Sequence, residues 1–127
     1  MAGMSHRVDS DFVHFVVESL QPLGPVVAKR MFGGHGIFMH DLMFALVAWD
    51  ILYLKADDVN RPSFEEKGLE PFAYTDQRGR SVKMSYFEAP SEGMDDPGLL
   101  SVWAKEAYAA ALRASPTRPS DKQRRRA

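Results

Sequence analysis

The stretch with the most potential for chemistry is Gly33-Gly34-His35-Gly36, which lies ahead of a long, mostly apolar run. Glycines beside a histidine could cradle a phosphate or surround a metal ligand. A phosphate-binding loop, however, leads into a helix, and G-G-x-G lacks the spacing of either nucleotide fingerprint. The residues that follow, 37–47, have the pattern of strand, turn and strand. We therefore interpret the glycines as a bend within one strand, Arg30 to Met39, where they serve backbone geometry.

The four histidines do not predict a metal or catalytic site. Zinc needs three or four ligands brought together, and the chain has no cysteine. His35 and His40 would point to opposite faces of a regular strand, and His14 lies off the apolar stripe of the first helix. A general base at His35 would need a nucleophile and an orienting carboxylate, which no sequence feature supplies. We expect no catalytic residue, no metal and no cofactor, and hence no enzyme.

Basic residues allow a second chemistry, the binding of nucleic acid. Five cations lie on or at the ends of predicted strands: Lys29, Arg30, Lys55, Arg80 and Lys83. If the sheet curves they could form one basic patch, but ordinary surface charges are the simpler interpretation.

The C-terminal tail offers another basic segment. Residues 113–127 carry six Lys or Arg and one Asp, a net charge of +5, whereas residues 1–112 carry −6. DNA-binding domains usually carry their positive charge on the folded face, so the acidic body argues against that class. Arg124, Arg125 and Arg126 leave weak, non-specific attraction to nucleic acid as an alternative.

Composition and length predict one globular domain. The chain has 127 residues, of which 45% are hydrophobic. We expect a flexible N-terminus at 1–10, a folded domain at 11–114 and a basic disordered tail at 115–127. Without cysteine, an N-terminal signal or an apolar run of membrane-spanning length, we expect a cytoplasmic protein with no membrane contact.

Periodicity and turn residues predict the elements around the glycines. Asp9 or Ser10 caps a first helix that ends at Gly24-Pro25. Its apolar stripe comprises Phe12, Phe15, Val16, Leu20 and Leu23.

Strands follow this helix. After the strand at 30–39, a turn at His40-Asp41 leads to a strand at 42–49, and a turn at Asp50 leads to another at 51–56. Such short connections require antiparallel neighbours, so these three strands form a meander.

The second half of the chain supplies two helices and a hairpin. A short helix opens at Asn60-Arg61-Pro62. Strands at 72–76 and 80–89 form the hairpin, and Asp95-Asp96-Pro97 starts the last helix. The predicted fold is therefore α+β, with an antiparallel sheet of about five strands and helices over one face. The other face also carries Phe, Tyr, Met and Trp, so either a homodimer contact or the helices and N-terminal segment cover it.

Short motifs in a fixed order give a family resemblance. The first group is Gly24-Pro25, Arg30-Met31-Phe32-Gly33-Gly34-x-Gly36, residues 43–47 and residues 52–57, with Tyr53 and Lys55 among them. The second is Gly68-x-x-Pro71-Phe72-x-Tyr74, Met84-Ser85-Tyr86-x-x-x-Pro90, residues 95–97 and Trp103-Ala104. In this order, over residues 11–112, they resemble the N-terminal domain of the TfoX (Sxy) family of competence regulators.

The resemblance implies an α+β domain with no catalytic activity and no cofactor. Full-length members regulate DNA-uptake genes as coactivators alongside the cyclic-AMP receptor protein and carry a second, C-terminal domain, whereas this chain stops after the first. We expect a regulatory module whose partner is a protein of the transcription machinery. Direct nucleic-acid binding, or a small-molecule pocket beside Gly33 to His35, are the alternatives.

Overall fold

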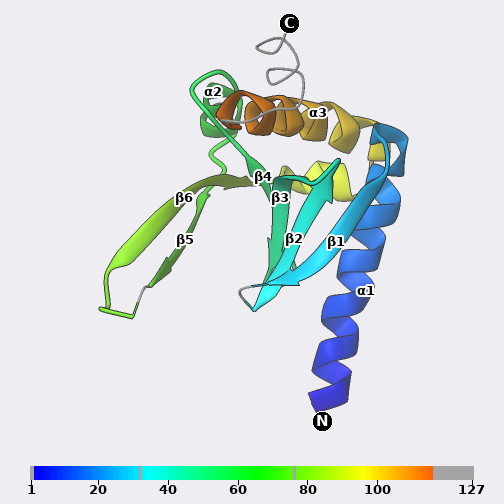
Figure 1. Ribbon diagram of the computed structural model, residues 1–127. Helices are drawn as coiled ribbons and strands as arrows, with labels where there is room; N and C mark the ends of the chain where they lie inside the picture. The colour runs from blue at the N-terminus through cyan, green and yellow to red at the C-terminus, as the bar shows by residue number, and fades with distance from the viewer. Residues whose placement is uncertain (1, 32, 76, 116–127) are drawn as a thin grey trace, which may run out of the picture.

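The sheet organises the whole chain (Figure 1). The computed structural model describes residues 2–31, 33–75 and 77–115. These residues form one six-stranded antiparallel sheet with the order β1-β2-β3-β4-β6-β5. The strands are β1 (Val26–Met31), β2 (Gly34–Met39), β3 (Leu42–Ala48), β4 (Ile51–Lys55), β5 (Pro71–Thr75) and β6 (Ser81–Glu88).

Within the described ranges, three α-helices and two short 3₁₀ helices accompany the sheet. They are α1 (Ala2–Leu20), η1 (Gln21–Leu23), α2 (Arg61–Glu66), η2 (Ser91–Met94) and α3 (Pro97–Ala114). In Figure 1, α1 runs beside β1, α3 lies across one end of the strands, and the β5–β6 hairpin extends away from β1–β3. The predicted α+β class, with its antiparallel sheet, is confirmed.

The prediction of one bent strand from Arg30 to Met39 is wrong. β1 and β2 are separate antiparallel strands in which Met31 pairs with Gly34 and Val26 with Met39. Gly33 lies between them with φ +77°, a left-handed conformation that glycine adopts readily. The chain therefore reverses at Gly33, which makes the meander four-stranded and the sheet six-stranded.

Two further hairpins have very short turns. His40 and Asp41 have φ values of 51° and 65°, and Trp49 and Asp50 have 55° and 59°. Positive φ at both central residues is the type I′ arrangement that suits the twist of a hairpin. The predicted turn at His40-Asp41 is confirmed, while Trp49 leaves its predicted strand and joins the next turn.

The main core lies between the helices and one face of the sheet. Val16 and Leu20 of α1, and Leu100 and Ala104 of α3, are fully buried there with Phe44 of β3. Small alanines on α3 let that helix approach the strands closely. The Phe44 ring meets Tyr108 of α3 edge-on, with 5.7 Å between centroids.

The first helix differs in detail from its prediction. It begins at Ala2, ahead of the cap expected at Asp9 or Ser10, so residues 2–10 of the expected flexible end belong to α1. Phe15 is 41% exposed, while Val13 is buried in its place, so the predicted stripe is rotated by part of a turn. A helix N-terminus has no unique sequence signal when polar residues continue upstream of the cap candidate.

The last helix begins as predicted. The Asp96 carboxylate accepts a hydrogen bond from the Leu99 backbone N–H at 3.1 Å, which caps α3. Phe32 and the tail residues 116–127, including Arg124, Arg125 and Arg126, lie outside the described residues. Within the described ranges, none of the helices combines the length and apolar character that a bilayer span requires.

Candidate functional site

The face of the sheet opposite the main core carries its own apolar residues. Register pairs Leu46 with Tyr53 across β3 and β4. A second buried cluster forms there from Leu46, Ala48, Tyr53, Phe72 and Tyr86, with Met43 and Ile51 packed against it. All of these residues come from strands. Among the described residues, therefore, the helices bury one face of the sheet and leave this second face to the strands.

An apolar groove of about 510 Å³ opens on the second face. Its lining, which defines the apolar groove below, comprises Met31, Gly33, Met43, Ala48, Trp49, Phe72, Met84 and Tyr86. Trp49 is 70% exposed, Met31 39% and Met84 37%. Large apolar side chains thus remain accessible to solvent around one hollow, which is the usual character of a binding surface.

Aromatic packing fixes one wall of the groove. The rings of Tyr53 and Phe72 meet edge-on with centroids 4.9 Å apart, and the Trp49 and Phe72 centroids are 5.7 Å apart. Because Trp49 lies in the β3–β4 turn and Phe72 in β5, these contacts join the meander to the β5–β6 hairpin.

Gly36 makes room for the methionines of the groove. A Cβ added at Gly36 would lie 2.6 Å from Met31 Sδ, 2.8 Å from Phe38 Cε1 and 3.1 Å from Met43 Sδ. Any side chain at this position would therefore push the two thioethers apart. The glycine is what allows Met31 and Met43 to converge over β2.

Two lysines of the second face lie over aromatic rings. Lys29 Nζ is 4.8 Å from the Phe38 ring centroid, and Lys55 Nζ is 5.2 Å from that of Tyr86, a lining residue. Both distances fit cation–π contacts. Burial raises the pKa of Tyr86 to about 12, so its phenol stays neutral at physiological pH.

The five cations predicted as one possible patch do not lie together. Arg30 pairs with His35, one position along β1 from Lys29, and so belongs to the opposite face. The side chain of Lys83 is not among those the structure describes. Of the predicted set, Lys29 and Lys55 share the second face, on strands separated by β2 and β3.

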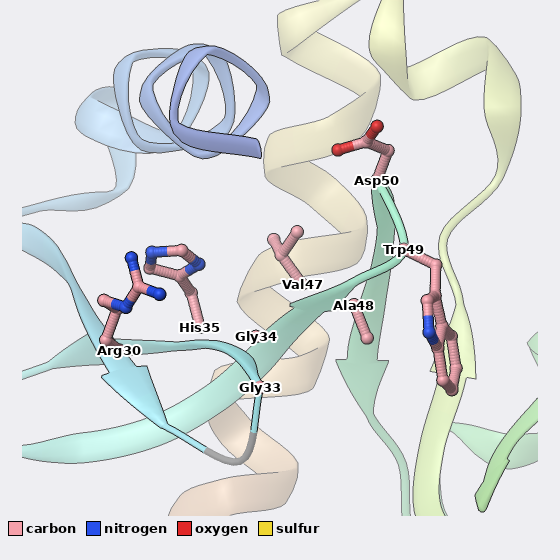
Figure 2. A pocket seen from close by; sticks show the side chains of 8 residues that line it. All are labelled: Arg30, Gly33, Gly34, His35, Val47, Ala48, Trp49 and Asp50. Atoms are coloured by element: carbon pink, nitrogen blue, oxygen red, sulfur yellow. The ribbon is translucent and has the colours of Figure 1, made fainter. Parts of the chain in front are cut away.

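The Gly33-Gly34-His35 segment borders a much smaller cavity (Figure 2). It measures about 30 Å³, and Arg30, His35 and Asp50 are among its lining residues. Figure 2 shows Arg30 and His35 close together, while Trp49 points away. The space suits about one water, since ligand pockets usually measure ~300–1,000 Å³. This cavity is therefore too small to be the deep polar pocket expected near His35, whereas Gly33 also lines the apolar groove of about 510 Å³.

Gly34 marks a close approach of two strands. A Cβ added there would overlap the Val47 carbonyl oxygen and would lie 3.4 Å from Val47 C and 3.5 Å from Ala48 Cα. These atoms are backbone and cannot rotate away. Glycine is therefore needed at position 34 because a side chain would overlap the neighbouring strand, whereas at position 33 it is needed because of the positive φ.

Three other residues of the motifs that carry the family resemblance take part in pairing or packing of the strands. Pro71 pairs with Phe87 at the start of β5. The Ser85 carbonyl accepts a hydrogen bond from the Ala56 N–H at 2.8 Å, which extends the pairing of β4 with β6. Tyr53 is buried in the second cluster, and burial together with the charge of Glu88 raises its pKa.

A polar cluster after β4 holds that strand to α3, and it was not predicted. Arg113 donates to Asp57 through Nε at 2.6 Å and Nη2 at 3.0 Å. These hydrogen bonds are the largest cause that lowers the pKa of Asp57, to about 2. The buried Asn60, predicted only as a helix cap, accepts from the Asp57 N–H and donates to the Lys55 carbonyl. The cluster is structural support for the strand that carries Lys55.

Titratable side chains do not gather into a metal site in the described part of the chain. No group of three or more His, Asp or Glu there could hold an ion. His14 is exposed, as predicted, and lies 3.5 Å from Glu18 one helical turn away.

Comparison with known proteins gives the same relationship that the motifs indicated. The family described as TfoX N-terminal domain matches residues 18–111. The DNA transformation protein TfoX1 of Aliivibrio fischeri is 32% identical over 104 residues, which cover 82% of this chain and 47% of that protein. The chain thus spans about half the length of this curated relative. With its matched segment running from α1 to α3, the chain belongs to the TfoX N-terminal domain family.

Proposed function

We propose that this chain is a non-catalytic regulatory module that binds a protein of the bacterial transcription machinery and so acts in competence control. The similarity to a DNA transformation protein supports the biological setting. It also supports a cytoplasmic location, where transcription takes place. The observation that carries the proposal is the apolar groove, which exposes Met31, Trp49 and Met84 around one hollow.

The groove suits protein binding better than catalysis. Its lining is dominated by methionine and aromatic side chains, and among the described lining residues the side-chain N–H and O–H groups are the Trp49 indole and the Tyr86 hydroxyl. A reaction would need a positioned base, nucleophile or metal, whereas a protein interface needs accessible apolar anchors. Methionine-rich surfaces are typical of binding sites that adapt to a partner.

A complementation experiment tests the proposal. A strain lacking this gene would receive wild type, Met84→Asp or the matched control Val102→Asp, which alters an exposed valine on α3. We expect Met84→Asp to abolish restoration of DNA-uptake transcripts while Val102→Asp behaves as wild type. Unchanged transcripts in the deletion strain itself would refute the proposal.

Direct binding to nucleic acid is a second candidate, supported by the net charge of +5 on residues 113–127. It predicts retarded migration of duplex DNA at low salt and steep weakening as salt rises. Removal of residues 116–127 should abolish that retardation. No binding of DNA at low salt would end this candidate.

A further inference from the structure

We propose that the apolar groove binds an amphipathic α-helix of a protein partner, with acidic residues flanking its apolar stripe and pairing with Lys29 and Lys55. The inference rests on the proposed function and adds the chemistry of the partner. Three features carry it: accessible anchors, a floor whose central strand is hydrogen-bonded on both sides, and two lysines on the same face of the sheet.

The anchors come from strands far apart in the sequence. Met31 ends β1, Trp49 lies in the β3–β4 turn and Met84 lies in β6, and all three are more than a third exposed. The Phe72 ring packs against Tyr53, with centroids 4.9 Å apart, and against the anchor Trp49, with centroids 5.7 Å apart, which makes this wall rigid. At about 510 Å³ the groove can take several apolar side chains, as the stripe of one helix face supplies.

The floor of the groove determines the conformation of the partner. Its central part, at Met43 and Ala48, is the face of a paired sheet, where the backbone groups of β3 are used on both sides, toward β2 and β4. A segment pressed onto such a face finds few backbone partners there and must satisfy its own N–H and C=O groups. An α-helix does this internally, whereas an extended peptide would need an open strand edge.

The charge of the second face indicates which side chains should flank the apolar stripe of the partner helix. Lys55 lies beside the groove over Tyr86, and Lys29 lies over Phe38, which borders the Met31 and Met43 thioethers above Gly36. Among the described residues, no carboxylate lies within ion-pair distance of either lysine. Glu88 shares this face, where it pairs with Tyr53, so the net charge of these three residues is +1. Carboxylates on either side of the apolar stripe therefore complement the surface.

Two occupants from this chain itself fit less well. The residues beyond the described ones at the C-terminus, PTRPSDKQRRRA, hold no large apolar side chain, and their charge has the same sign as the lysines. A second copy docked symmetrically through this face would meet a surface of the same net charge, +1 for Lys29, Lys55 and Glu88, which disfavours association. A separate, acidic helix meets neither difficulty.

Selection from a displayed library of 16-residue helical peptides tests the inference on the full chain. Selected peptides would be labelled with fluorescein, and their affinities measured by anisotropy. We expect apolar residues three and four apart with Glu or Asp on either side. Trp49 reports the location, because its exposed indole should shift to shorter emission wavelength on binding, and Trp49→Phe should remove that shift.

Variants separate the contributions of apolar contact and of charge to the affinity for the peptide. Met84→Asp should weaken binding at least tenfold, while the control Val102→Asp leaves it unchanged. Lys29→Glu combined with Lys55→Glu should weaken acidic peptides about tenfold and strengthen versions with Lys at the flanks, since attraction becomes repulsion. Circular dichroism on each variant confirms that the fold is intact.

Several results would overturn the inference. Selected peptides without acidic flanks, or with affinities indifferent to the double charge reversal, would remove the charge argument. Doubling of mass together with a concentration-dependent shift of Trp49 emission would assign the groove to a second copy, and saturable binding of DNA at Trp49 would assign it to nucleic acid. If Met84→Asp abolishes regulation in cells but no acidic helix binds, the proposed function stands and this inference fails.

Discussion

Gly34→Ala should destabilise the fold by about 2–4 kcal/mol, at the upper end of what overpacking costs. The added methyl group would overlap the Val47 carbonyl oxygen, and the next nearest atoms, Val47 C and Ala48 Cα, are backbone as well. A side chain could turn away from such a contact, but a strand can only move as a whole.

The size of this destabilisation follows from the hydrogen bonds and packing that β2 and β3 would lose on moving apart. Restoring van der Waals contact requires β2 and β3 to separate by about 1 Å near Gly34. The nearest register pairs are His35 with Val47 and Gly36 with Leu46. Lengthening two or three ladder hydrogen bonds at about 1 kcal/mol each gives about 2–3 kcal/mol, and loss of packing beneath them adds the rest.

Urea unfolding followed by circular dichroism measures the effect. With a slope of about 2 kcal/mol per molar urea, the midpoint should fall by about 1–2 M. Gly98→Ala is the matched control, because Gly98 lies in the first turn of α3 with only the Asp96 carboxylate near its missing Cβ, at 3.4 Å. This control should be neutral or slightly stabilising. A Gly34→Ala midpoint within error of wild type would refute the packing explanation.

Four other predictions follow from named contacts. Gly33→Ala should cost about 1 kcal/mol because of its positive φ, and Gly33→Asn less, as measured by urea midpoints. Asp57→Asn should cost about 1 kcal/mol, a value kept small because the Arg113 side chain is 38% exposed. Since the folded-state pKa of Asp57, about 2, lies below its unfolded value, this contribution is present above pH ~4 and lost as pH falls toward 2, so wild type and Asp57→Asn should converge in stability there. Phe44→Ala should cost about 3–5 kcal/mol, because a fully buried ring leaves a cavity against Tyr108; a shift below 1 kcal/mol in thermal unfolding would contradict this.

Local features were predictable because they depend on neighbours in sequence. The cap at Asp96 and the turn at His40-Asp41 follow from side-chain chemistry within four residues, and both are present. Gly33 was harder, since a glycine in an apolar run can bend a strand or reverse it. Only pairing partners, which lie elsewhere in the chain, distinguish these outcomes.

The groove could not be located from sequence because it depends on long-range register. Met31 and Met84 are 53 positions apart and line the same groove only because the strand order places β6 beside β4. Arg113 and Asp57 are separated by 56 positions, and no periodicity connects them. The motifs did mark part of this surface, since Met31, Phe72, Met84 and Tyr86 were all among the resemblance residues.

In the turn of the β3–β4 hairpin, the residue that would best suit the backbone conformation differs from the residue that would best suit partner binding. Trp49 adopts a φ of 55°, a backbone region where Asn or Gly would be more favourable than a bulky aromatic residue. Trp49→Gly would therefore relieve the turn, yet it would remove the most exposed side chain lining the groove. A substitution that raises the stability of the fold at this position would therefore lower the affinity for a partner. Directed evolution for heat resistance alone should tend to erase this tryptophan, whereas selection for partner binding should retain it.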